Sequence, residues 1–336
     1  MSIHKDSLLD NFASVLDNKH ILITGAAGML GSSLAKELVN LKKTSSSNIV
    51  ISLLARNKNR LPTNLLKYQE QDFNFIEQDI NNLDLPEESF DLIFNFASPA
   101  SPLYQRLDHQ NLAESNTRGI KNLTETLNYD GIQEPIFVHM SSGDVYDQQS
   151  QRIKLRENLA VSSESTNDSN PYSISKLISE EILFKESKRL GYKYLIFRPF
   201  NTYGPGLRLG EGRLIGDIFE SIINNQLFSL QSNPKNINSF CYIEDFITGL
   251  ITCINNARFD EIFNLGNDLE LHNFFNLKDV IENSLKLDLK CSYTKNDDSP
   301  VLFKIPDLTK LRELGWAPNY SLDYGIEKTY HSLINA

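Results

Sequence analysis

The 336-residue chain has few cysteines, and the three that it has lie far apart in the sequence. Cys241, Cys253 and Cys291 form no C-x-x-C pair, and their odd number does not suit a disulfide framework. The six histidines show no metal-binding spacing either. We therefore expect reduced thiols, a cytoplasmic location and no metal site.

Long hydrophobic runs are also missing, so we expect no membrane partner, because no apolar segment approaches the length that spans a bilayer. The first 19 residues lack a continuous apolar core, which predicts a short docked helix there rather than a signal peptide. The net charge of −10 argues against nucleic acid as a partner, because non-specific binding needs a basic surface.

What the chain does contain is a regular alternation of short apolar runs with longer amphipathic stretches. Continuous apolar runs are typical of buried parallel strands, and the stretches between them have helical periodicity. The alternation predicts an α/β fold, a Rossmann-like doubly wound parallel sheet with a smaller C-terminal substrate lobe. The expected strands are residues 21–23, 49–54, 73–76, 92–96, 136–140, 194–197 and 261–266.

The same pattern predicts how the chain is divided. We expect an N-terminal extension over residues 1–19, a dinucleotide-binding domain over 20–198 and a substrate lobe over 199–336. Since 261–266 has the pattern of one more sheet strand, about 237–266 should return to the first domain.

The most informative local motif is the glycine-rich stretch T-G-A-A-G-M-L-G at residues 24–31, which follows the first apolar run. Such a turn before a helix suits a dinucleotide pyrophosphate, because backbone N–H groups and the helix dipole favour the anion. A plain packing turn is the alternative. Gly25 would allow the sharp turn, Gly28 the approach of the phosphates and Gly31 close helix–strand packing. The expected cofactor contacts are Gly25, Ala27, Gly28, Met29, Leu30 and Gly31.

A second group of residues points to hydride-transfer chemistry. Tyr172 and Lys176 lie four residues apart at the start of a predicted helix and therefore share one face. A nearby ammonium would lower the Tyr pKa from about 10, and such a Tyr can exchange a proton with a sugar hydroxyl. Ser142 follows the strand at 136–140, at the end where open sheets bind ligands. We predict Ser142, Tyr172 and Lys176 as catalytic residues.

Together these motifs resemble the extended short-chain dehydrogenase/reductases of the NAD-dependent epimerase/dehydratase family, from about His20 to the C-terminal region. R-P-F-N-T-Y-G-P at 198–205 and L-G-W-A-P at 314–318 also match. The resemblance implies a nucleotide-diphosphate sugar in the C-terminal lobe, hydride transfer usually at sugar C4, and a homodimer through helices at about 112–127 and 172–190. It further implies cofactor contacts at Asp79, Ile80, Ala97, Asn116, Tyr172, Lys176 and Pro199, and substrate contacts at Ser98, Asn201, Arg213 and Asn238.

Within the family, A-S-P-A-S-P at 97–102 and G-R-L-I at 212–215 are most similar to UDP-glucuronate decarboxylase (UDP-xylose synthase). Three positions depart from that pattern. Gly143 and Asp144 stand where the decarboxylases have a hydroxyl residue and Glu, and where 4,6-dehydratases need an Asp–Glu pair. Asn238 stands where the decarboxylases have Arg, and an amide cannot neutralise a carboxylate as a guanidinium does.

We therefore predict a nucleotide-sugar oxidoreductase or epimerase. Asp144 would assist as a base, with a solvated turn residue as the alternative reading. A decarboxylase with a rearranged site and a non-catalytic dinucleotide sensor are the alternative functions.

The end of the second strand bears on the choice between NAD and NADP. An acidic residue there binds the ribose 2′-hydroxyl of NAD, whereas an Arg accommodates the 2′-phosphate of NADP. This chain has Ala55 at the acid position, and Arg56, Lys58 and Arg60 follow. The sequence favours NADP over NAD. Alternatively, Arg56 is a solvated loop charge and the backbone alone holds NAD.

Overall fold

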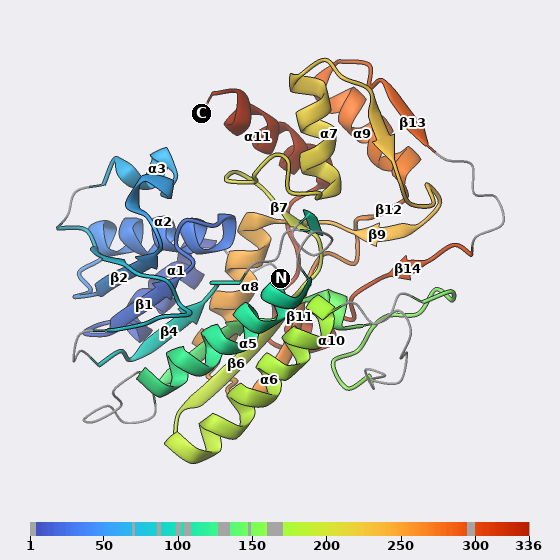
Figure 1. Cartoon of the computed structure of the whole chain (residues 1–336). Coiled ribbons are helices and arrows are strands. Elements are labelled where there is room, and N and C mark those ends of the chain that lie inside the picture. The colour runs from blue at the N-terminus through green and yellow to red at the C-terminus, as the bar shows by residue number, and fades with distance from the viewer. Residues whose placement is uncertain are drawn as a thin grey trace.

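Seven parallel strands form the central sheet of the protein (Figure 1). The computed structural model describes residues 5–68, 71–85, 89–98, 102–103, 109–126, 135–146, 149–159, 171–293 and 300–335. From edge to edge the strands are β3 (Asn74–Glu77), β2 (Val50–Ala55), β1 (His20–Thr24), β4 (Leu92–Asn95), β5 (Ile136–Met140), β6 (Lys193–Pro199) and β11 (Glu261–Leu265). Each contains or overlaps one of the predicted apolar runs, so the predicted doubly wound fold is confirmed.

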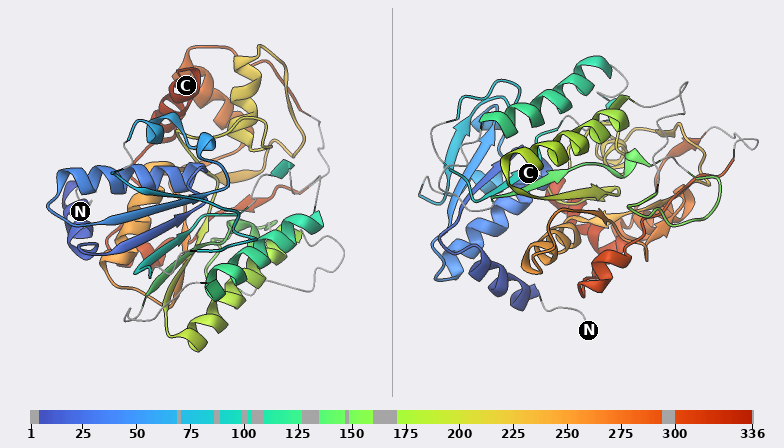
Figure 2. Two further views of the ribbon diagram at one scale, coloured as in Figure 1. Left: turned by 60° about the vertical axis from the view of Figure 1, so that its left-hand side comes forward. Right: turned by 90° about the horizontal axis from the view of Figure 1, so that it is seen from below.

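Helices cover both faces of this sheet (Figure 2). On one face lie α1 (Lys5–Val15), α2 (Met29–Thr44) and α8 (Ile243–Asn255), and on the other lie α5 (His109–Thr126) and α6 (Pro171–Leu190). Each face of the sheet has its own hydrophobic core, and the side chains of β1 alternate between the two. Ile21 and Ile23 pack in the core on the first face, and Leu22 packs in the core on the second. Burial on both faces explains why the strands read as continuous apolar runs.

The predicted N-terminal helix is α1, and it docks against α8. The Asn255 side chain donates a 3.0 Å hydrogen bond to the Leu8 carbonyl, and Phe12 is fully buried. No helix within the described ranges combines the length and the apolar character that crossing a bilayer requires.

Smaller elements build a second group beyond the carboxyl ends of the strands (Figure 1). β9 (Ile237–Ser239) lies between β12 (Leu271–His272), which is antiparallel to it, and β14 (Phe303–Lys304), which is parallel. The other elements here are β7 (Thr202–Tyr203), α7 (Leu214–Ile223), β8 (Phe228–Leu230), β10 (Cys241–Tyr242), α9 (Phe274–Leu285), β13 (Cys291–Tyr293) and α11 (Leu322–Ile334).

The chain returns to the central sheet after this excursion. β11 pairs with β6, and α10 (Thr309–Glu313) packs against β11. β9, by contrast, pairs with the smaller strands, so the part of 237–266 that lies at the central sheet is α8 and β11. The short elements η1 (Lys58–Arg60), α3 (Thr63–Leu66) and η2 (Gly143–Val145) follow the ends of strands β2 and β5. The division of the chain into domains stays a prediction.

Candidate active site

The strand order reverses between β1 and β4, and this reversal places the glycine-rich turn at the ligand crevice of the sheet. Gly25 has a φ of +64°, and a Cβ atom on it would lie 2.7 Å from the backbone of Phe96 and Ala97, which follow β4. Only glycine allows this turn and this close approach. The two connections that meet at the crevice are therefore in direct backbone contact.

The start of α2 needs glycine for a similar reason. A Cβ atom on Gly31 would lie 2.5 Å from the carbonyl oxygen of Gly25, so the predicted packing role of Gly31 is confirmed. Gly28 is the N-cap residue of α2 and has no side chain with which to cap the first N–H groups. The turn leads into the N-terminus of α2 and lines a cavity, and the first N–H groups of a helix fit an anionic pyrophosphate.

A cavity of 810 Å³ runs from this turn across the carboxyl ends of the strands to the second lobe. That volume is within the usual range for small-molecule and cofactor sites. The predicted site residues that line it are Gly25, Ala27, Gly28, Met29, Leu30, Gly31, Arg56, Asp79, Ile80, Ala97, Ser98, Ser142, Asp144, Tyr172, Lys176, Pro199, Asn201 and Arg213.

Two predicted contacts do not line this cavity. Asn116 is buried on α5, where its side chain accepts a 2.8 Å hydrogen bond from Ser98 and donates a 3.0 Å one to Ser175. It therefore orients Ser98, which does line the cavity. Asn238 lies on β9 and borders a separate, smaller hollow of about 20 Å³. Of the family-like segment at 97–102, residues 99–101 lie outside the described part of the chain.

The three predicted catalytic residues come together although Ser142 is 30 positions from Tyr172. Ser142 follows β5, and its hydroxyl hydrogen-bonds the side chain of Tyr172 on α6. Lys176 is 2% exposed and donates a 2.8 Å hydrogen bond from Nζ to the Met140 carbonyl. Its Nζ lies 5.7 Å from the centroid of the Tyr172 ring. The end of a buried strand and the first turns of a helix thus form one cluster.

The pKa values of this cluster differ from the prediction. Burial raises the pKa of Tyr172 well above its usual value, the Asp144 carboxylate raises it further, and the Ser142 hydrogen bond only partly opposes them. Burial also lowers the pKa of Lys176 to about 7. The expected lowering of the Tyr172 pKa is therefore wrong, because desolvation of the phenolate and the Asp144 charge outweigh the Ser142 hydrogen bond and the charge of Arg213. Tyr172 is a protonated hydroxyl at neutral pH.

Lys304 is a cavity residue that the sequence analysis missed. It lies on β14, is nearly buried, and forms an ion pair with the Asp144 carboxylate. Burial opposes ionisation of Asp144, but the Lys304 ammonium outweighs it and holds the pKa of Asp144 below its usual value. Because 160 positions separate these residues, no local pattern in the sequence could have paired them.

Gly143 has a packing explanation. A Cβ atom at this position would lie 3.0 Å from the carbonyl oxygen of Pro199 and 3.1 Å from the ring of Phe200. A side chain here would have to displace the strand end that carries Pro199. Tight packing against Pro199 and Phe200 therefore favours a glycine at position 143.

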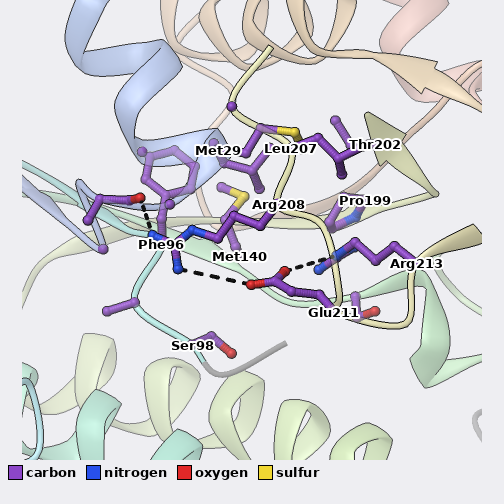
Figure 3. Close-up of a pocket in the computed structure, with 18 of the residues that line it drawn as sticks. Met29, Phe96, Ser98, Met140, Pro199, Thr202, Leu207, Arg208, Glu211 and Arg213 are labelled. Atoms are coloured by element: carbon purple, nitrogen blue, oxygen red, sulfur yellow. Dashed lines mark hydrogen bonds and ion pairs between the residues drawn. The ribbon is translucent and has the colours of Figure 1, made fainter. Parts of the chain in front are cut away.

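Two arginines reach the cavity from the segment between β7 and α7 (Figure 3). Arg208 donates a 2.6 Å hydrogen bond to the carbonyl of Ala27 in the glycine-rich turn. The carboxylate of Glu211 lies between Arg208 and Arg213, at 4.0 and 3.9 Å. These guanidinium groups bring positive charge to the mouth of the cavity in a chain whose net charge is −10.

The far end of the cavity is formed by the residues that follow β2 and β3. Arg56 and Arg60 are exposed residues that line it, and Ala55 contributes no carboxylate. Asp79 and Ile80 line it as well, and the side chain of Asp79 accepts a 2.9 Å hydrogen bond from the backbone N–H of Asn81. This end fits an adenosine whose ribose would face arginine side chains.

Comparisons with known proteins agree with this architecture. A model of the NAD dependent epimerase/dehydratase family matches residues 21–266. UDP-glucuronic acid decarboxylase 6 of Arabidopsis thaliana is 25% identical over 327 residues, which cover 95% of this chain and 90% of that protein.

Solved structures have the same fold. UDP-glucuronic acid 4-epimerase from Bacillus cereus, in complex with UDP-glucuronic acid and NAD, is 21% identical with a TM-score of 0.80 and covers 94% of this chain and 99% of its own. An epimerase from Methanothermobacter thermautotrophicus is 21% identical with a TM-score of 0.82 and covers 99% and 97%.

Proposed function

Since the chain belongs to the NAD dependent epimerase/dehydratase family, we propose that it is a nucleotide-sugar oxidoreductase or epimerase that acts at a sugar hydroxyl or keto carbon, C4 by preference. One observation carries the proposal. A single cavity joins the glycine-rich turn at Gly25–Gly31 to the cluster of Ser142, Tyr172 and Lys176. A nicotinamide dinucleotide bound at this turn would supply the hydride donor or acceptor.

The catalytic cluster would supply the proton chemistry. In the reductive direction Tyr172, protonated at neutral pH, would donate its hydroxyl proton to a sugar keto oxygen. In the oxidative direction the tyrosine must first lose that proton, and its phenolate would then take the proton of the sugar hydroxyl. Ser142, whose hydroxyl donates to Asp144 in this structure, would turn that hydroxyl to hydrogen-bond the same oxygen. Lys176, with a pKa of about 7, is poised to exchange a proton at working pH, and its bond to the Met140 carbonyl fixes its position.

Replacing the tyrosine tests this function. Tyr172→Phe should lower turnover of the nucleotide-sugar substrate by at least about 10²-fold, because it removes the proton donor, and should leave dinucleotide binding intact. The half-exposed Tyr293, whose contacts are with aromatic rings, gives the control Tyr293→Phe. Unchanged activity or cellular function in Tyr172→Phe would support the sensor alternative. Mass spectrometry of the cofactor released from the purified protein would identify the dinucleotide.

We also propose NADP as the favoured cofactor, because Arg56 and Arg60 line the adenosine end where Ala55 supplies no carboxylate. NADPH should bind about tenfold more tightly than NADH, and Arg56→Ala should erase the difference. Lys58→Ala is the control, since Lys58 belongs to the same segment but does not line the cavity. Equal affinities of the wild-type protein for NADPH and NADH, measured by fluorescence titration, would overturn the proposal.

A decarboxylase is the second candidate. The observation that favours it is the 25–27% identity to several UDP-glucuronic acid decarboxylases over more than nine-tenths of this chain. Release of carbon dioxide from added UDP-glucuronate separates the two candidates.

Two further properties complete the proposal. A homodimer through α5 and α6 is supported by three exposed apolar side chains on α6, at Ile174, Ile178 and Phe184. A cytoplasmic location is supported by the three cysteines, all of which are free thiols.

A further inference from the structure

The ion pair between Lys304 and Asp144 joins the second lobe to the catalytic turn. Lys304 lies on β14, next to Asn238 of β9 in the parallel register. Backbone hydrogen bonds of 2.8 and 3.2 Å tie its neighbour Phe303 to Gln149, on the segment that follows the catalytic turn. The backbone that carries Lys304 is therefore held from both sides.

The Asp144 carboxylate is held equally firmly. One of its oxygens contacts Lys304, and the other accepts a 3.1 Å hydrogen bond from the Ser142 hydroxyl. The backbone N–H of Asp144 donates a 3.0 Å hydrogen bond to the Ser142 hydroxyl, and the backbone carbonyl of Asp144 accepts a 2.6 Å hydrogen bond from the Ser173 hydroxyl. Its side chain is still 41% exposed, so this fixed carboxylate presents an anionic surface to the cavity.

Within the Asp144–Lys304 pair the charges are balanced, whereas the single carboxylate of Glu211 is shared by Arg208 and Arg213. A sugar that carried its own carboxylate would meet the carboxylate of Asp144, and like charges brought together in a cavity repel. A hydroxymethyl or methyl substituent meets no such repulsion.

From this arrangement we infer that the Asp144–Lys304 pair selects nucleotide sugars with an uncharged ring substituent and rejects uronates. The Asp144 carboxylate already neutralises the ammonium of Lys304, which a substrate carboxylate would otherwise pair with. The pair therefore acts as a specificity determinant. The inference rests on the proposed function, because it names the class of nucleotide sugar that this cavity accepts.

Binding of UDP-glucose and UDP-glucuronate tests the inference, because these ligands differ only at sugar C6, which is a hydroxymethyl group in one and a carboxylate in the other. Calorimetry on the full chain loaded with its dinucleotide should give an affinity for UDP-glucose at least about tenfold higher. Asp144→Asn removes the repelling charge and releases Lys304, so the preference should shift toward UDP-glucuronate by about tenfold or more. Adding Lys304→Met to Asp144→Asn should cancel that gain.

The outcomes separate the two levels of the proposal. If the wild-type protein binds both sugars equally or prefers UDP-glucuronate, or if Asp144→Asn leaves the preference unchanged, the specificity inference is wrong while the proposed function stands. If it binds neither of these sugars nor their dTDP counterparts, the proposed function itself fails. Asp144→Ala removes the same charge with a different side chain and should shift the preference in the same direction. Thermal unfolding of each variant shows whether a change in binding only reflects misfolding.

Discussion

At the scale of single residues, burial rather than sequence spacing decides the chemistry of the candidate site. Tyr172 and Lys176 are four positions apart, and that spacing correctly predicts that they share a helix face. Their pKa values move in opposite directions, because desolvation disfavours the phenolate of Tyr172 and the ammonium of Lys176 alike. The result at neutral pH is a protonated tyrosine beside a lysine that is close to its midpoint.

The buried lysine predicts a pH dependence of stability in protein stripped of its dinucleotide. Its pKa is 10.5 in the unfolded chain and about 7 in the folded one, so the unfolded state binds more protons between those values. The free energy of unfolding of the wild-type protein should therefore rise relative to that of Lys176→Met as the pH increases from about 7 toward 10. Urea unfolding at several pH values measures this difference, and a difference that stays constant with pH would contradict the buried ammonium.

At the scale of elements, the β1–turn–α2 unit shows why glycine occurs where it does. Gly31 packs against the carbonyl of Gly25, and Gly25 packs against the connection after β4. The motif alone left a packing turn and a dinucleotide turn as alternatives. The structure shows the close packing, and Gly28, Met29, Leu30 and Gly31 also line the cavity, while binding of a dinucleotide by this turn stays a proposal.

A substitution within this unit tests the packing. Gly31→Ala should destabilise the protein by about 1–3 kcal/mol, since its methyl group would overlap a backbone oxygen that cannot move alone. Gly28→Ala is the matched control for stability, because its methyl group would lie 3.3 Å from the same oxygen at an ordinary φ of −85°. Denaturant titration compares the two, and equal stabilities would refute the packing argument.

At the scale of the whole molecule, three apolar side chains on α6 remain exposed among the described residues. Ile174, Ile178 and Phe184 are 42, 45 and 40% exposed, and α6 lies beside α5 on the outer face of the sheet (Figure 2). Nothing within the described part of the chain buries them further. A two-fold symmetric partner would cover them with the identical side chains of its own α6.

Light scattering at micromolar concentration tests the dimer. Ile178→Lys should shift the mass from dimer toward monomer, because it places a charge among these apolar side chains. Ile223→Lys at the end of α7 is the control, with a similar starting exposure of 40%. A monomeric wild-type protein would contradict the proposed assembly.

The sequence by itself determined the elements of this protein and much of the candidate site. Continuous apolar runs predict the seven strands because both faces of a parallel sheet are buried, and glycine and Tyr–Lys spacings identify local geometry. Only the tertiary structure decided the pairing of Lys304 with Asp144, the room available at Gly143, the positions of Asn116 and Asn238 outside the cavity, and the direction of the Tyr172 pKa. These depend on contacts between residues far apart in the chain and on how fully each group is removed from water, and neither is encoded in local pattern.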